Sequence, residues 1–242
     1  RTTKTWSAGT GELVHVLDAG NVALQGAVGF SPDGSRIAVG GRTFRLRVYE
    51  TGTWRLLYEV DRGTRGREQA TTLLAFSGDS SKIILGDGWR DGATVHDAVT
   101  GELLHSLEQA IPVAIDVHAD GRRAIMGSMN GTASVWDLET GERLAYRGGH
   151  RAQVRGVAFA PDGSHVVTDS WDGRLRAWEL PGGTLRFTSE AQPAAARAWN
   201  LKYSPDGRFL ARGMSIWLEL WDAQRAQRLR RLRRKCRPSR SR

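Results

Sequence analysis

The chain has 242 residues, of which 40% are hydrophobic and 25% charged, and this composition is typical of a folded globular protein. Its single cysteine, Cys236, excludes a disulfide framework and any metal site built from several cysteines. No apolar run approaches the roughly 18 residues of a membrane-spanning helix. The first residue is Arg1 and no apolar signal segment follows it, so we expect a cytoplasmic fragment or processed piece of a longer protein.

The net charge of +9 is concentrated at the carboxyl end of the chain. Residues 223–242 hold nine Arg, one Lys and no acid, which is a charge of +10 and leaves −1 for residues 1–222. The body of the chain is therefore close to neutral, and this weakens the inference from a high isoelectric point to nucleic-acid binding. We expect the Arg-rich tail 223–242 to be disordered or helical, and we expect a nucleic acid to bind, if at all, through Arg225–Arg242 only.

One sequence pattern recurs five times along the chain. The copies are FSPDGSRIAVGG from Phe30, FSGDSSKIILGD from Phe76, VHADGRRAIMGS from Val117, FAPDGSHVVTDS from Phe159 and YSPDGRFLARGM from Tyr203. Their turn aspartates are Asp33, Asp79, Asp120, Asp162 and Asp206, which gives spacings of 46, 41, 42 and 44 residues. A period in the low forties is typical of the blades of a β-propeller.

A second pattern follows each copy and marks a further strand. It reads VYE at Tyr49, VHD at His96, VWD at Trp136, AWE at Trp178 and LWD at Trp221, and TWS at Trp6 is an additional copy. Short runs of alternating or β-branched apolar residues lie between Asp-Gly, Asn-Gly and Thr-Gly pairs, and Asp-Gly and Asn-Gly supply the positive φ angles of tight hairpins. Each unit therefore predicts a meander of about four short antiparallel strands, which must stack against its neighbours to bury its faces.

Together with trailing segments such as VTGEL and ETGERL, these patterns recur in register, and the chain resembles the WD40-repeat β-propeller family over residues 1–222. The repeats are degenerate, because one unit alone has the Gly-His pair, Gly149-His150, and the literal Trp-Asp pair is kept only at Trp136 and Trp221. The resemblance implies an all-β fold of four-stranded antiparallel blades. These blades are expected near residues 21–66, 67–108, 109–148, 149–190 and 191–222, with residues 2–17 as the outer strands of a partial blade.

The number of repeats leaves two arrangements open. The chain has five first strands but six third strands, counting the one around Trp6, and most family members have seven blades. We therefore favour a truncated propeller with two outer strands, four full blades and most of a sixth, as an open fragment of a seven-bladed ring. The alternative is a compact ring in which Glu12–Leu17 supplies the outer strand of the last blade.

The fourth unit carries acids, a histidine and aromatic residues within a short stretch, VVTDSWDGRLRAWEL. The resemblance implies that four of these side chains form a buried hydrogen-bonded tetrad, and by position they are His150, Thr168, Asp172 and Trp178. A fully satisfied buried network fixes one geometry, so we favour this structural role over a catalytic His–Asp pair. The third unit has Met126 and Asn130 at the Thr and Asp positions, and the fifth has Ser215 at the Asp position; we expect these blades to rely on packing and to be less stable.

The resemblance also implies a partner-binding face at the loops before the first strands and at the turns before the Asp positions. By position the candidates are Gln153, Arg155 and Trp171 in the fourth blade, Arg197 and Trp199 in the fifth, Arg90 in the second, and Ile111, Val113 and Met129 in the third. Trp171 lies in a hairpin turn, where it cannot be part of its own blade's core. Trp and Arg are enriched in binding hot spots, and together they suit an acidic or phosphorylated peptide.

Three functions remain open. The favoured function is a non-enzymatic scaffold for protein or peptide partners, as the sensor or regulatory part of a larger multidomain protein, with no cofactor, metal or small-molecule substrate expected. The first alternative is a propeller enzyme of the lactonase or hydrolase-associated type, which also uses SPDG hairpins; no zinc-protease, phosphate-loop, serine-hydrolase or dinucleotide motif supports it. The second alternative is nucleic-acid binding through the basic tail.

Overall fold

The computed structural model describes residues 2–18, 27–40, 45–61, 73–86, 92–108, 110–192, 198–214 and 217–233, and every helix-or-strand element in these ranges is a β-strand. An N-terminal sheet pairs β1 (Thr2–Trp6) with β2 (Leu13–Asp18). Five antiparallel four-stranded sheets, here called blades 1 to 5, follow in chain order. The first two have these strands: β3 (Val28–Phe30), β4 (Arg36–Gly40), β5 (Arg45–Glu50) and β6 (Leu56–Asp61) in blade 1, and β7 (Leu73–Phe76), β8 (Lys82–Gly86), β9 (Ala93–Asp97) and β10 (Leu103–Leu107) in blade 2.

The remaining three blades repeat this order of strands. Blade 3 contains β11 (Pro112–Val117), β12 (Arg123–Ser128), β13 (Ala133–Asp137) and β14 (Arg143–Arg147); blade 4 contains β15 (Val154–Phe159), β16 (His165–Ser170), β17 (Leu175–Glu179) and β18 (Leu185–Thr188); and blade 5 contains β19 (Ala198–Tyr203), β20 (Phe209–Met214), β21 (Trp217–Asp222) and β22 (Gln227–Arg233). Each blade is a simple meander, because every strand pairs with the strand that follows it in sequence.

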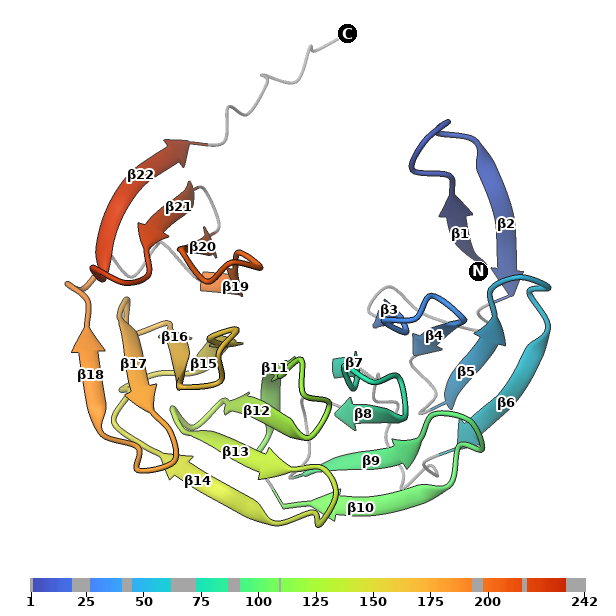
Figure 1. Cartoon of the computed structure of the whole chain (residues 1–242), viewed down its shortest axis with the longest axis horizontal. Coiled ribbons are helices and arrows are strands. Elements are labelled where there is room, and N and C mark those ends of the chain that lie inside the picture. The colour runs from blue at the N-terminus through green and yellow to red at the C-terminus, as the bar shows by residue number, and fades with distance from the viewer. Residues whose placement is uncertain are drawn as a thin grey trace, which may run out of the picture.

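The sheets lie around a common centre with their first strands innermost, as in a β-propeller (Figure 1). The arc is open: the N-terminal sheet and blade 5 stand at its two ends, apart from each other (Figure 1). The fold is therefore the predicted all-β propeller of repeated blades, without closure of the ring.

The hydrophobic core is divided among the interfaces between successive sheets. The cluster between blades 1 and 2 includes Val48 and Ile83, that between blades 3 and 4 includes Val135 and Val157, and further clusters lie at the other interfaces. A four-stranded sheet has two faces, and here each face that packs on a neighbour is covered with buried apolar side chains. Stacking of the blades therefore supplies the burial that stabilises each one.

The repeated Ser-Pro-Asp-Gly turn joins the first and second strands through local hydrogen bonds. In blade 1 the Asp33 carboxylate accepts from the Ser31 hydroxyl at 2.5 Å and from the Ser35 backbone N–H at 2.9 Å. These hydrogen bonds, led by the one from Ser31, lower the pKa of Asp33 to about 2. Gly34 has a φ of 70°, a conformation that L side chains adopt at a cost, so the Asp-Gly pair specifies the turn.

Two expectations about the ends of the chain are wrong. Gln227–Arg233 is neither disordered nor helical, because it forms β22, the outer strand that completes blade 5. The compact ring is excluded as well, since β2 pairs with β1 and the outer-strand position of blade 5 is taken by β22. Four of its seven residues are arginines, and one of them, Arg231, pairs with Glu219 of β21. Residues 234–242 lie outside the described part of the chain.

Candidate functional site in blade 4

The predicted tetrad residues meet in a hydrogen-bonded chain across blade 4. The Trp178 indole Nε1–H donates to Thr168 Oγ1 at 3.0 Å, and Thr168 Oγ1 lies 2.8 Å from His150 Nε2. On the other side of the imidazole, His150 Nδ1 lies 3.0 Å from Asp172 Oδ2. A proton on Nδ1 lets the imidazole donate to Asp172 and lets Nε2 accept from the Thr168 hydroxyl, and Arg176 Nη1 lies against the same Nδ1.

Burial and charge together set the protonation of this chain. Burial lowers the pKa of His150, and the hydrogen bond with Asp172 opposes that change. Burial acts to raise the pKa of Asp172, but hydrogen bonds from His150 and Arg176 outweigh it and hold the pKa well below its usual range. Arg176 Nη1 donates to Asp172 Oδ2 at 3.0 Å, so the network contains a neutral imidazole between a carboxylate and a hydroxyl.

The His150–Asp172 pair is enclosed within its own blade. The side chains of His150 and Asp172 are only 2% and 8% exposed. The Asp172 carboxylate also accepts from the Arg151 backbone N–H at 3.1 Å, and it thereby joins the loop before β15 to the β16–β17 turn. A general base must reach the proton that it removes, and this one is enclosed by its own blade.

Three candidate binding residues come together beside the tetrad, and we call Gln153, Arg155 and Trp171 the blade 4 patch. The Trp171 backbone N–H donates to the Gln153 carbonyl at 3.0 Å, so the β16–β17 turn lies against the segment before β15. Arg155 Nε donates to Gln153 Oε1 at 2.8 Å, and the Arg155 guanidinium carbon lies 5.0 Å from the centroid of the Trp171 ring. Burial lowers the pKa of Arg155, although arginine remains a cation in proteins.

The other candidates whose side chains the structure describes lie in blade 3. Met129 is half-buried in the β12–β13 turn of blade 3, and its backbone N–H donates to the Ile111 carbonyl at 3.1 Å. Val113 lies in β11. Arg90 and Arg197 lie outside the described residues, and so does the side chain of Trp199, whose backbone belongs to β19. The blade 4 patch is thus the part of the predicted face that the structure assembles.

Blade 5 contains a buried ionic network that the sequence analysis missed. Arg212 on β20 donates from Nε and Nη2 to the two Asp169 oxygens of blade 4, both at 2.7 Å, and its Nη1 lies 3.4 Å from Glu219 Oε2. All three side chains are fully buried. The Trp221 Nε1–H donates to the same Glu219 oxygen at 3.2 Å. The Glu219 carboxylate thus accepts the indole hydrogen bond that the Thr168 hydroxyl accepts in blade 4.

The Arg-rich strand β22 completes this network. Arg231 donates to Glu219 Oε1 from Nε at 2.9 Å and from Nη2 at 2.6 Å, and Arg228 Nη1 lies 3.2 Å from the same oxygen. Burial opposes the ionisation of Glu219, but Arg231, Arg212 and Arg228 outweigh it and lower its pKa. Burial raises the pKa of Asp169 to about 6, against the effect of Arg212.

The expectation that blade 5 relies on packing alone is therefore wrong. A signal was present in the sequence: an arginine in the second strand of a blade, LARG, faces a glutamate in the third, LELW. Both lie at positions that are buried in a propeller blade, and buried charges occur in proteins when they are paired. The pairing with Asp169 of another blade has no such local signal.

The described residues contain neither a cluster of metal ligands nor a membrane-spanning helix. No group of three or more His, Cys, Asp or Glu side chains in these ranges is arranged to hold a metal ion. Within the same ranges, no helix has the length and hydrophobicity needed to cross a membrane.

Comparison with known proteins identifies the repeats. The family model for the WD domain, G-beta repeat matches residues 101–137 and 141–179, and each match covers the fourth strand of one blade and the first three strands of the next. The chain therefore contains at least two WD repeats. WD-repeat proteins generally act as scaffolds for protein interactions and are typically not enzymes.

Its relatives among characterised proteins are themselves diverse. The chain is 34% identical to bovine Coronin-7 over 144 residues, which are 57% of this chain and 15% of Coronin-7. It is 31% identical to human WD repeat-containing protein 36 over 112 residues, 45% of this chain and 12% of that protein. A Protein LST8 homolog of Drosophila pseudoobscura pseudoobscura is 24% identical over 220 residues, 86% of this chain and 68% of the relative. The chain thus spans less than a sixth of the first two relatives.

Proposed function

We propose that this WD-repeat protein is a non-enzymatic scaffold that binds an acidic peptide segment of a protein partner through the blade 4 patch. The observation that carries the proposal is the Arg155 guanidinium over the Trp171 ring, 5.0 Å from its centroid, in a turn at the end of a blade. A ring and a cation held together offer an apolar surface and a positive charge at one place. Trp and Arg are the residue types most enriched in binding hot spots.

The rigidity of blade 4 supports this role. The Asp172 carboxylate follows Trp171 directly in the β16–β17 turn and is fixed by His150 and Arg176. The Trp171 ring is half-buried and its backbone is held by Gln153. A side chain presented on such a fixed turn loses little conformational freedom when a partner binds.

The test is a selection of random peptides on the immobilised protein, followed by affinity measurements with the enriched peptides. We expect enrichment in Asp and Glu, and a loss of affinity of about tenfold or more in Arg155→Gln and in Trp171→Ala. Both variants should unfold at the same urea concentration as the unchanged protein. Peptides without acidic enrichment, or with an affinity that neither variant alters, would contradict the proposal.

Arg151→Gln is the matched control. Arg151 precedes the patch in the same loop and its side chain is exposed. If its removal weakens binding as much as the removal of Arg155, the peptides respond to general positive charge and not to the blade 4 patch.

A further inference from the structure

A cavity of about 190 Å³ lies between blades 4 and 5, separate from the blade 4 patch. Its apolar lining consists of Val167, Leu175, Ala177 and Phe187 from blade 4, with Leu210 and Trp221 from blade 5. His165, at the start of β16, also lines it, whereas Trp171 follows the end of that strand. Six residues of extended chain span about 20 Å, so the two sites lie at opposite ends of β16.

The cavity lies beside a position that holds a large residue in blades 3 and 4 and a small one in blade 5. Leu138, Leu180 and Ala223 are equivalent: each backbone N–H donates to the carbonyl of the turn residue two places after the repeat's aspartate, at 2.7, 2.9 and 3.0 Å. Leu138 is fully buried in the core between blades 2 and 3, and Leu180 packs against the core between blades 3 and 4. Ala223 has no such bulk, and the space beside it stays open between blades 4 and 5.

The aromatic residue that fills the same space between blades 1 and 2 cannot do so here. In blade 1, Tyr58 extends its hydroxyl to the carbonyl of Ala98, the counterpart of Ala223, at 2.7 Å. Its equivalent in blade 4 is Phe187. Tyr58 pairs with Val48 and Phe187 pairs with Ala177, and each partner is the residue directly before the aromatic residue of the third strand. Phe187 has no hydroxyl, and its ring meets Trp221 edge-on with centroids 6.3 Å apart.

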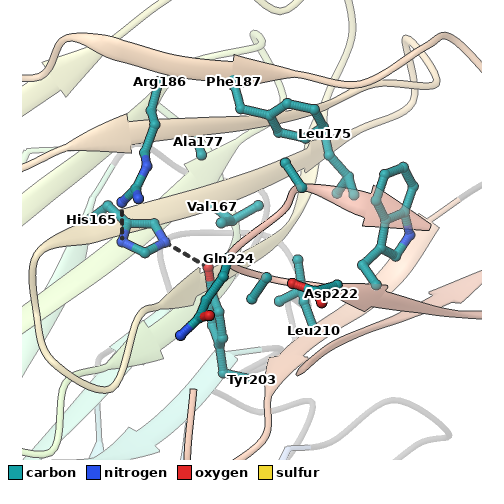
Figure 2. A pocket seen from close by; sticks show the side chains of 13 residues that line it. His165, Val167, Leu175, Ala177, Arg186, Phe187, Tyr203, Leu210, Asp222 and Gln224 are labelled. Atoms are coloured by element: carbon teal, nitrogen blue, oxygen red, sulfur yellow. Dashed lines mark hydrogen bonds between the residues drawn. The ribbon is translucent and has the colours of Figure 1, made fainter. Parts of the chain in front are cut away.

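One side of the cavity is polar, and hydrogen-bond donors dominate it. His165 Nε2 lies 2.8 Å from the Tyr203 hydroxyl, and Arg186 Nη1 lies 3.4 Å from His165 Nδ1. Figure 2 shows these three side chains with Gln224 along one side and Phe187 with Leu175 on the other. His165 Nδ1 also lies 2.9 Å from Ser164 Oγ, whose hydrogen is donated to Asp162, so the neutral ring donates from Nδ1 and its Nε2 accepts from the Tyr203 hydroxyl.

The charges around the cavity leave a cation available. Arg186 is exposed and has no ion pair within the described ranges, and the Gln224 amide has no hydrogen-bond partner there. Asp222 also lines the cavity, but its carboxylate is paired with Arg225 at 3.1 Å. Asp162 and Glu179 act on His165 from blade 4, and the Asp162 carboxylate is already hydrogen-bonded to Ser164.

We propose that this cavity is a second peptide-binding site, which takes a phenylalanine-sized apolar side chain whose neighbouring carboxylate pairs with Arg186. The size fits, because an apolar cavity of about 150 Å³ holds benzene. The polarity fits as well, since an apolar lining with a few convergent polar groups is the usual composition of a binding pocket. The guanidinium and the amide can both donate hydrogen bonds to a carboxylate.

The test follows the alanine methyl groups that line the cavity, Ala177, Ala223 and Ala226, by NMR of protein with ¹³C-labelled alanine methyls. The probe is the blocked peptide Gly-Phe-Glu-Gly, compared with Gly-Phe-Gln-Gly and Gly-Ala-Glu-Gly. We expect the first peptide to shift these methyl signals through the phenyl ring. The second should bind about fivefold more weakly, as expected for loss of an exposed ion pair, and the third should leave the signals in place.

Two variants locate the site. Ala223→Leu restores the side chain that blades 3 and 4 have and should abolish the shift of Ala177, with the other alanine signals and the thermal midpoint of unfolding retained as evidence of folding. Arg186→Gln should reduce the affinity for Gly-Phe-Glu-Gly to that for Gly-Phe-Gln-Gly. Trp171→Ala should leave cavity binding unchanged, so failure of the blade 4 patch and failure of this site are distinguishable.

Three outcomes would overturn the proposal. One is an absence of methyl shifts with the Phe-Glu peptide, and another is retention of the shifts in Ala223→Leu. The third is binding of free 3-phenylpropionate as tight as that of the peptide, because the occupant would then be a small aromatic acid that needs no peptide backbone.

Discussion

Blades 4 and 5 fill the same structural positions with opposite chemistry. In blade 4, Thr168 faces Arg176 across β16 and β17, and the threonine accepts the hydrogen bond of Trp178. In blade 5, the facing pair is Arg212 and Glu219, and the glutamate accepts from the tryptophan. Blade 4 uses a chain of neutral groups that ends at the Asp172 carboxylate and its own Arg176, whereas blade 5 uses charges that extend to the neighbouring blade and to the outer strand.

In both blades the buried indole N–H and the polar groups beside it have hydrogen-bond partners, although the residue types that supply those partners differ. Blade 3 shows the contrast, since Met126 stands at the threonine position and faces Ser134. There the buried Trp136 Nε1 and Ser134 Oγ have no hydrogen-bond partner within the described part of the chain. An unsatisfied buried donor costs about 1–3 kcal/mol, so blade 3 should contribute less to stability than blade 4 or blade 5.

The largest effect is expected from Glu219→Gln. The substitution keeps the shape of the side chain but leaves Arg212, Arg228 and Arg231 around a neutral group. Breaking a fully buried ion pair costs about 3–5 kcal/mol, and the free energy of unfolding in urea should fall by about 3 kcal/mol. The control is Glu142→Gln, an exposed glutamate of blade 3, which should change stability by less than about 0.5 kcal/mol. Equal effects of the two would show that the network is not formed.

Asp172→Ala in blade 4 should be less severe. It removes the acceptor of His150 and Arg176, and we expect a loss of about 1–3 kcal/mol in the free energy of unfolding. The neighbouring substitution Trp171→Ala should leave stability nearly unchanged and weaken partner binding instead. If Trp171→Ala lowers the thermal midpoint as much as Asp172→Ala does, Trp171 is a structural residue and the blade 4 patch loses its anchor.

Much of this contrast was readable in the sequence, because it follows from local repetition. Turn aspartates such as Asp33 and third-strand rings such as Trp178 recur in register, and they predicted the blades and positioned the tetrad residues. The role of β22 was not readable, since its arginines resemble a solvated tail until Glu219 is known to face them. The Asp169–Arg212 contact and the cavity beside Ala223 depend on how one blade packs on the next, which no local pattern encodes.

His150 and His165 make the free energy of unfolding depend on pH. Burial lowers the pKa of His150 and of His165 below the ordinary 6.5, so below that pH the unfolded chain takes up protons at these rings before the folded chain does. Stability is then fully present above about pH 6.5 and declines as the pH falls towards the lowered folded-state values. The turn aspartates act at lower pH, since the pKa of Asp33 and of Asp120 is about 2 when folded.

Urea unfolding at about pH 7.5 and about pH 5.5 measures this decline, which should be smaller than the effect of Asp172→Ala. In the double variant His150→Gln, His165→Gln stability should be slightly greater at about pH 5.5 than at about pH 7.5, because the raised pKa of Asp169, about 6, makes the folded chain take up that proton before the unfolded chain does. The loss of stability at the lower pH should therefore disappear. If it persists, other groups titrate in this range and the buried neutral imidazoles are not its cause.

The smallest expected effect is a gain in stability at the turn after β21. The turn between the third and fourth strands ends on a residue with a positive φ in blade 4 and in blade 5. The φ is 70° at Gly183 and 52° at Ala226. The left-handed conformation costs an L residue about 1 kcal/mol, so Ala226→Gly should raise the free energy of unfolding by up to that amount, reduced by the greater freedom of glycine in the unfolded chain. Gly183→Ala should lower it by a similar amount. Because the two substitutions are reciprocal at equivalent positions, equal signs in urea unfolding would mean that the turns differ in more than their side chains.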